Sequence, residues 1–285
     1  MRRLAACLIL GIGGLLLAPG APGVTNVPGD PTPPEVVAEM TGTLGANGWY
    51  TTNITVRWRV SDPESIILET QGCDTRTLNT DTAGTRLECR AVSDGGETTI
   101  AKTFKVDKTA PTVTATPARP ADQNGWYNRA LSVSFTGGDA ASGVESCNPA
   151  ASYSGPDSSS VSIGGGCRDR AGNLGTGSVA IRYDATGPAA SGVPVRVPDR
   201  AGWYNRPVAF AMQGTDALSG VDSCPTTSYA GPDSANASFT GACFDKAGNL
   251  GTKAIALRYD GTGPQVAASP SRGPDSTAGT TSRSP

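Results

Sequence analysis

Histidine is missing from the whole sequence of 285 residues. Histidine is the commonest general base near neutral pH and the commonest ligand of zinc and copper. Its absence therefore excludes most hydrolase triads. A pair of carboxylates could still do acid–base work, but no Asp or Glu cluster stands out from the aspartates that turns require. We expect a protein that is not an enzyme and that uses no cofactor.

Charge and aromatic rings are also scarce. Charged residues make up 17% of the chain, the formal net charge is −2, and aromatic residues contribute 6%. Neither nucleic acid nor an anionic membrane surface is indicated as a partner. By contrast, 37 glycines and 22 prolines suit short strands joined by many turns. Since no capped helical periodicity is sustained, the sequence predicts an all-β fold.

Long apolar runs are absent except at the N-terminus. Met1-Arg2-Arg3 is followed by apolar residues from Leu4 to Ala18 and then by the small residues Gly20-Ala21-Pro22-Gly23. This pattern is typical of a secretory signal peptide, which we predict at 1–21. The alternative is an uncleaved anchor, which the short, glycine-interrupted run disfavours. We expect a secreted mature chain without a membrane span.

The chain repeats itself at a constant interval. Trp49, Trp126 and Trp203 lie 77 residues apart, each within Gly-Trp-Tyr followed by Thr or Asn, and Cys147 and Cys224 keep the same interval. The repeat is long enough to be a whole domain. We predict a Pro/Gly-rich segment at 22–33, repeats at 34–110, 111–187 and 188–263, and a tail at 264–285 that begins a fourth repeat and is expected to be disordered.

Each repeat opens and closes with alternating apolar residues, the pattern of strands with one buried face. Asp169–Asn173 and Asp245–Asn249, matched by Ser93–Gly96, are predicted hairpin turns between the last two strands. Short linkers ending in proline should join the repeats with limited bending. The alternating positions are Ile54, Val56, Trp58, Val60, Leu131, Val133, Phe135, Val179, Ile181, Tyr183, Val208, Phe210, Met212, Ile255, Leu257 and Tyr259.

Cysteines come in pairs, two in each repeat. The second member of each pair lies on an apolar strand face and should point inward. In an exported protein, the spacing of 16 to 20 residues favours one disulfide per repeat, with free buried thiols as the alternative. The predicted pairs are Cys73 with Cys89, Cys147 with Cys167, and Cys224 with Cys243.

The motifs together point to a known family. "GWYN", an alternating strand, "D-x-x-S-G-V-x-S-C", "D-x-A-G-N" and "Y-D-x-T-x-P" resemble the bacterial immunoglobulin-like repeats of secreted and cell-surface proteins, over roughly residues 31 to 264. The resemblance implies tandem β-sandwiches that act as spacers, stalks or adhesive modules. It is specific for the fold and weak for function, because such sandwiches have many roles.

Two motifs allow a structural and a ligand-binding interpretation. Trp126 and Tyr127 are adjacent on an extended chain, so only one ring can enter the core, and the other should pack on the linker or the next repeat; a sugar-stacking platform is the alternative. Repeated aspartates are expected to cap turns, with calcium binding as the alternative. These are Asp139, Asp169, Asp184, Asp216, Asp245 and Asp260.

The sequence therefore predicts a secreted, extracellular or cell-wall-associated array of immunoglobulin-like domains. Its predicted function is that of a spacer or protein-interaction module at the bacterial cell envelope. An adhesin or carbohydrate-binding array, with calcium as a stiffener, is the alternative. The expected partner is a protein or glycan at the cell surface, and the chain is expected to be a monomer.

Overall fold

A computed structural model describes residues 29–269, 271 and 272. The predicted signal peptide lies outside the described residues, as do most of the 22–33 segment and the end of the 264–285 tail. The chain forms two compact units. Among the described residues, the first comprises 29–116 together with 134–151 and 164–178, and the second comprises 117–133, 152–163 and 179–269.

Strands make up nearly all the regular structure of the described residues, which confirms the all-β prediction. The first repeat contains β1 (Glu35–Thr41), a 3-10 turn η1 (Ala46–Gly48), β2 (Trp49–Tyr50), β3 (Ile54–Ser61), β4 (Ile67–Gln71), β5 (Arg76–Leu78), β6 (Thr82–Ser93) and β7 (Gly96–Val106). The second contains β8 (Thr112–Pro117), β9 (Trp126–Tyr127), β10 (Leu131–Gly138), β11 (Val144–Cys147), β12 (Ala151–Tyr153), β13 (Ser158–Asp169) and β14 (Leu174–Tyr183). The third contains β15 (Ala189–Pro194), β16 (Trp203–Tyr204), β17 (Val208–Thr215), β18 (Val221–Ser223), β19 (Thr227–Tyr229), β20 (Ser234–Asp245) and β21 (Leu250–Tyr259).

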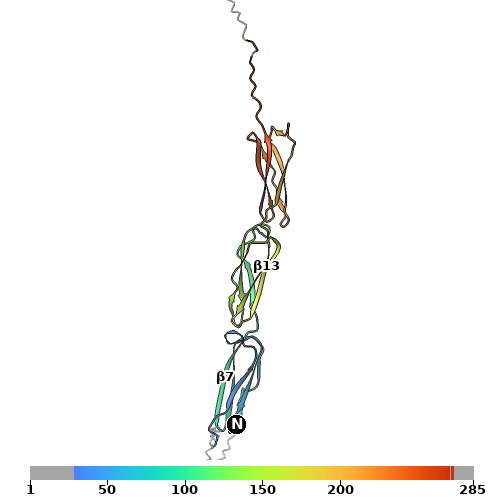
Figure 1. Ribbon diagram of the computed structural model, residues 1–285. Helices are drawn as coiled ribbons and strands as arrows, with labels where there is room; N and C mark the ends of the chain where they lie inside the picture. Colours follow the sequence, from blue (N-terminus) through green and yellow to red (C-terminus); the bar gives the residue numbers. More distant parts are fainter. Residues whose placement is uncertain (1–28, 270, 273–285) are drawn as a thin grey trace, which may run out of the picture. The chain divides into compact units, whose positions relative to one another are not determined.

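The strands of each repeat form one three-stranded and one four-stranded sheet. The orders are β1-β3-β5 with β2-β7-β6-β4, then β12-β10-β8 with β11-β13-β14-β9, then β15-β17-β19 with β16-β21-β20-β18. In the first repeat, where β7 is labelled, and in the third, drawn in orange, the strands lie in two layers (Figure 1). The result is a tandem series of immunoglobulin-like β-sandwich domains.

The core of the first sandwich is built by the alternating residues of β3 and β7. Ile54 and Val56 are fully buried and face Phe104 and Val106 of the opposite sheet. Successive side chains of a strand point to opposite faces, so the residues between them remain more exposed. The predicted buried face of this strand is confirmed.

The third sandwich, in the second compact unit, repeats this arrangement. Val208, Phe210 and Met212 of β17 pack against Leu257 and Tyr259 of β21 in one apolar cluster. In β10 of the middle repeat, the corresponding positions are also buried; they are Leu131, Val133 and Phe135. The same sequence periodicity thus gives the same buried positions in all three repeats.

The predicted hairpins are present. Ser93 pairs with Gly96 across the turn from β6 to β7. In the later repeats the turn closes with backbone hydrogen bonds from Asp169 N to the Asn173 carbonyl and from Asp245 N to the Asn249 carbonyl, both 3.1 Å. Gly172 and Gly248 have φ of 102° and 89°, where a residue with a Cβ is strained.

Each sandwich holds one disulfide. The bonds join Cys73 to Cys89, Cys147 to Cys167, and Cys224 to Cys243, at sequence separations of 16, 20 and 19 residues. The second cysteine of each pair is fully buried, as its strand position predicts. In every repeat the bond therefore ties the end of a short edge strand, or the residues directly after it, to the long neighbouring strand.

Candidate functional site at the repeat junctions

The linkers after the first and second repeats each start on a buried aspartate, which is anchored by the second aromatic residue of the Gly-Trp-Tyr motif. Asp107 N donates to the Tyr50 carbonyl at 2.9 Å, and Asp184 N donates to the Tyr127 carbonyl at the same distance. Asp107 and Asp184 are at most 1% exposed. The short β2 and β9 strands therefore fix the point at which the chain leaves one sandwich.

A second aspartate in each repeat accepts hydrogen bonds from the linker residues that follow the first one. Asp81 accepts hydrogen bonds from the Lys108 amide, at 3.0 Å, and from the Thr109 hydroxyl. Asp157 and Asp233 do the same in the later repeats, at Ala185 with Thr186 and at Gly261 with Thr262. None of the three was predicted from the sequence, although the recurring Gly-Pro-Asp at 155–157 and 231–233 was a signal for the later two.

The predicted turn-capping aspartates gather with the linker aspartate. One carboxylate oxygen from each of Asp107, Asp139 and Asp169 lies within 4.8 Å of the others, inside the first compact unit. Asp139 Oδ1 accepts the amides of Ala141, Ser142 and Gly143. The turn-cap interpretation of Asp139 is thereby confirmed, and Asp216 caps the matching turn through Leu218 and Gly220.

The asparagine of the D-x-A-G-N turn reaches the preceding linker. Asn173 Nδ2 donates to the Asp107 carbonyl at 3.0 Å, while Ser142 N donates to Asp107 Oδ2 at 3.1 Å. On the opposite side, Asn47 Nδ2 donates to the Arg170 carbonyl at 2.9 Å. Turn residues of the second repeat thus bind the end of the first repeat and its linker directly.

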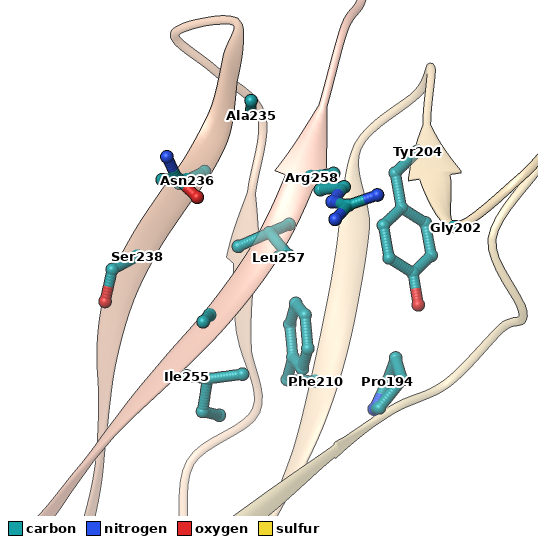
Figure 2. Close-up of a pocket in the computed structure, with 12 residues that line it drawn as sticks. Pro194, Gly202, Tyr204, Phe210, Ala235, Asn236, Ser238, Ile255, Leu257 and Arg258 are labelled. Carbon is teal, nitrogen blue, oxygen red and sulfur yellow. The ribbon is translucent and has the colours of Figure 1, made fainter.

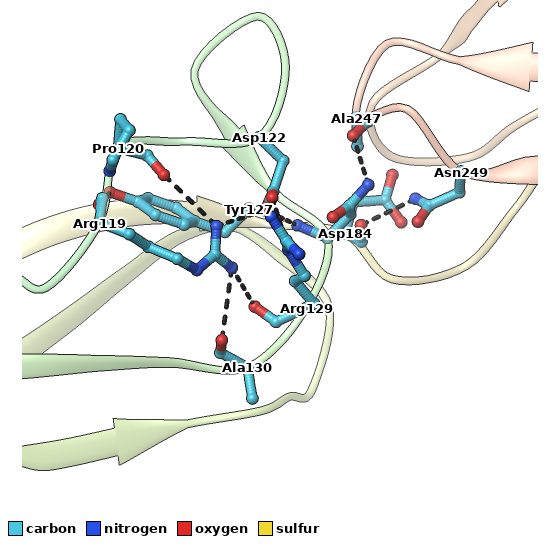
Figure 3. A network of polar contacts seen from close by, with 10 residues as sticks. Arg119, Pro120, Asp122, Tyr127, Arg129, Ala130, Asp184, Ala247 and Asn249 are labelled. Carbon is cyan, nitrogen blue, oxygen red and sulfur yellow. Dashed lines mark hydrogen bonds and ion pairs between the residues drawn. The ribbon is translucent and has the colours of Figure 1, made fainter.

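The same contacts recur in the second compact unit. Asn249 Nδ2 donates to the Asp184 carbonyl at 2.8 Å, and Asn128 Nδ2 donates to the Ala247 carbonyl at 2.9 Å. Figure 3 shows these bonds where the loop after β9 meets the β20–β21 turn. Asp184, Asp216 and Asp245 form the matching carboxylate cluster. Each of these contacts stays inside one compact unit.

An ion-pair network holds the loop around the Gly-Trp-Tyr motif of the middle repeat (Figure 3). Asp122 lies between Arg119 and Arg129, at 2.7 and 2.8 Å. Burial raises the pKa of Asp122, but hydrogen bonds from the Asn128 amide and the two guanidinium groups outweigh this and lower the pKa overall. Asp199 repeats the arrangement with Arg196 and Arg206. Neither network was predicted from the sequence.

A third carboxylate cluster lies at the start of the described chain. Asp30, Asp62 and Glu64 each place an oxygen within 4.8 Å of the others. Asp30 precedes Asp107 by 77 residues, and Asp62 precedes Asp139 by the same interval. β6 ends at Ser93, whereas the corresponding strands β13 and β20 end at Asp169 and Asp245. The sequence analysis missed this cluster because the first repeat lacks the D-x-x-S-G and D-x-A-G-N motifs.

The two aromatic rings of the Gly-Trp-Tyr motif have different positions. Tyr204 belongs to the core of the third sandwich, whereas Trp203 is half-buried and lies outside that cluster. In the other repeats the tryptophan is covered by a cation from the neighbouring strand, with Lys105 Nζ 5.1 Å from the Trp49 ring and Arg182 Cζ 5.3 Å from the Trp126 ring. The core ring is therefore the tyrosine.

This burial argues against the sugar-platform interpretation. Trp49 and Trp126 are 7% and 6% exposed, which leaves little ring surface for a sugar to stack on. A cavity of about 470 Å³ in the third sandwich is lined by Tyr204, Phe210 and Arg258 (Figure 2). Both aromatic rings there are almost fully buried against their own core. Residues of both sheets of the third sandwich line the cavity.

The fold, the sheet registers and the cores define the chain as a tandem immunoglobulin-like β-sandwich protein. No family model matches the chain, and no curated protein matches its sequence. Solved structures do resemble it. An I-band fragment of titin shares 11% identity over 80% of this chain and 99% of its own, with a TM-score of 0.39.

A tetra-tandem repeat from the extending region of a large adhesion protein shares 15% identity over 80% of this chain and 75% of its own, with a TM-score of 0.25. Fibronectin(III)-like modules of Clostridium thermocellum CbhA share 11% over 53% of this chain and 94% of theirs, also at 0.25. At TM-scores this low, these likenesses carry no argument about activity. Among the described residues, no helix is long and apolar enough to cross a membrane.

Proposed function

We propose that the chain is a secreted, non-enzymatic immunoglobulin-like repeat protein of the bacterial type, acting as a spacer or protein-interaction module at the cell envelope. The repeats would correspond to residues 34–110, 111–187 and 188–263. The chain would act as a monomer with a protein or glycan partner at the cell surface. The three disulfides support an oxidising, extracellular location, because such bonds rarely persist in a reducing cytosol.

One observation carries the spacer proposal: residues of the recurring linker and turn motifs hold consecutive repeats together. Asn173 and Asn249 bind the linker backbone, and Asp107 and Asp184 receive amides from the next repeat. Hydrogen bonds from a side chain to a fixed backbone group contribute about 0.5–1.5 kcal/mol each. Several per junction restrict bending, which is what a spacer requires and an independent ligand-binding module does not.

The test is the width of a distance distribution across one junction. Spin labels carried on genetically encoded side chains replace Ser159 and Thr252, which are exposed residues of the same compact unit. The labels avoid the disulfide cysteines. Pulsed electron resonance on the full chain should give one narrow distribution. Asn128→Ala, which removes the bond to the Ala247 carbonyl, should broaden it.

The matched control is Asn236→Ala, an exposed asparagine of β20 with no side-chain role at the junction. This variant should leave the distribution unchanged. A distribution already broad in the unmodified chain, or one that Asn128→Ala leaves equally narrow, would remove the basis of the spacer proposal.

A further inference from the structure

The carboxylate cluster at the start of the described chain differs from its two counterparts in how its oxygens are satisfied. Asp30 is 4% exposed, yet its Oδ2 is buried without any hydrogen-bond donor among the described residues. Its Oδ1 accepts the Thr32 amide, at 3.3 Å. A buried carboxylate oxygen without a donor is costly unless another positive group reaches it.

Asp62 shows the same deficit. Its Oδ1 accepts the amides of Glu64 and Ser65 at 2.9 and 3.1 Å, whereas its Oδ2 is buried and has no partner in the described part of the chain. Two of the three carboxylates in this cluster therefore each have one buried oxygen without a hydrogen-bond donor in the described part of the chain.

In the second and third clusters the equivalent oxygen is satisfied. Asp107 Oδ2 accepts the Ser142 amide and Asp184 Oδ2 accepts the Ser219 amide, at 3.1 and 3.0 Å. Ser65, the counterpart of Ser142 by the 77-residue interval, donates its amide to Asp62 Oδ1. The first repeat thus keeps the carboxylates but does not supply the amide that would complete Asp30.

The backbone of the β6–β7 turn approaches the cluster so closely that no side chain fits between them. A Cβ at Gly95, in the β6–β7 turn, would overlap the Thr32 carbonyl oxygen and Asp30 Oδ1. Glu64, which is exposed, adds a third carboxylate and accepts the Thr32 hydroxyl. Carboxylate and carbonyl oxygens, without nitrogen or sulfur ligands, are the set that Ca²⁺ prefers, in flexible arrangements of about six to eight oxygens completed by water.

We propose that Asp30, Asp62 and Glu64 form a calcium site at the start of the first sandwich, distinct from the turn-capping clusters of the later repeats. The ion supplies the positive charge that Asp30 Oδ2 and Asp62 Oδ2 lack. Because the third ligand is an exposed glutamate, affinity should be that of extracellular modules, with a Kd on the order of 10⁻⁴ to 10⁻³ M.

The experiment is equilibrium dialysis of the full chain against radioactive calcium, together with thermal melting in calcium and in chelator. Asp30→Asn and Glu64→Gln should each weaken binding at this site at least tenfold and reduce the rise in Tm that calcium causes. Glu64 is exposed, so Glu64→Gln tests the site without a risk to the core, and circular dichroism checks that Asp30→Asn is folded.

Asp107→Asn is the matched control, because its cluster has the amide that the first one lacks. This variant should bind calcium at the first site as tightly as the unmodified chain. The proposal is overturned if the unmodified chain takes up no calcium at about 10 mM free ion, roughly ten times the weakest Kd expected for such a site. It is equally overturned if folded Asp30→Asn binds as the unmodified chain does, or if only Asp107→Asn loses binding.

Discussion

Replacing Tyr204 tests whether the tyrosine, and not the tryptophan, of the Gly-Trp-Tyr motif completes the sandwich core. Tyr204 is 5% exposed, packs in the cluster with Val208 and Phe210, and donates its hydroxyl to the Arg196 carbonyl at 3.3 Å. Removing a buried aromatic ring costs about 3–5 kcal/mol. Tyr204→Ala should therefore destabilise the third sandwich by that amount, whereas Trp203→Ala, which truncates a half-buried ring, should cost only about 1–2 kcal/mol.

The assay is native-state hydrogen exchange of the full chain, followed by mass spectrometry on peptides from β17 and β20. Since 1.4 kcal/mol is a factor of ten, Tyr204→Ala should accelerate exchange there roughly a hundredfold to several thousandfold. Tyr204→Phe, which keeps the ring and loses one hydrogen bond, should cost about 0.5–1.5 kcal/mol. The reasoning fails if Trp203→Ala accelerates exchange as much as Tyr204→Ala.

Two further predictions concern charge and covalent cross-links. The pKa of Asp199 is lowered, first by the Arg206 hydrogen bond and then by the Asn205 amide. The ionised carboxylate therefore contributes fully to stability above about pH 4, the pKa of an aspartate in the unfolded chain, and this contribution declines as pH falls further. Asp199→Asn should lower Tm at pH 6 and lower it much less near pH 2. An equal loss of Tm at both pH values would contradict this. Replacing both Cys147 and Cys167 with alanine removes a cross-link that closes a loop of 20 residues and contributes about 3 kcal/mol to stability. Calorimetry should therefore show a lower Tm for the middle sandwich, and reductant should not lower that Tm further. The disulfide contribution would be contradicted if the unmodified chain had the same Tm with and without reductant.

The sequence predicted those parts of the fold that follow from local rules. Period-two alternation identified Ile54 and Val56 as a buried strand face, and the D-x-A-G-N spacing located the last hairpin, because side-chain alternation and turn chemistry are properties of short segments. Which ring of Trp203 and Tyr204 enters the core was left open. That choice depends on the parallel pairing of β16 with β21, a contact between distant segments.

The junctions were predicted only in part for the same reason. Aspartates such as Asp139 were recognised as turn caps, but their meeting with Asp107 depends on how two repeats are joined. Asp81 was not predicted, because an isolated aspartate before a strand has no distinctive local pattern. Its role depends on a contact with the linker, 27 residues later in the chain. The cluster around Asp30 could have been found by extending the 77-residue interval upstream of the first tryptophan.

The division into compact units passes through the middle repeat instead of between repeats. The facing ends of two neighbouring sandwiches therefore lie inside one compact unit. A fragment cut at Pro188 would deprive Asn128 of the Ala247 carbonyl and Asp184 of the Ser219 amide, so isolated repeats should be less stable than the same repeats in the chain. Damage to one repeat should accordingly lower the unfolding free energy of its neighbour.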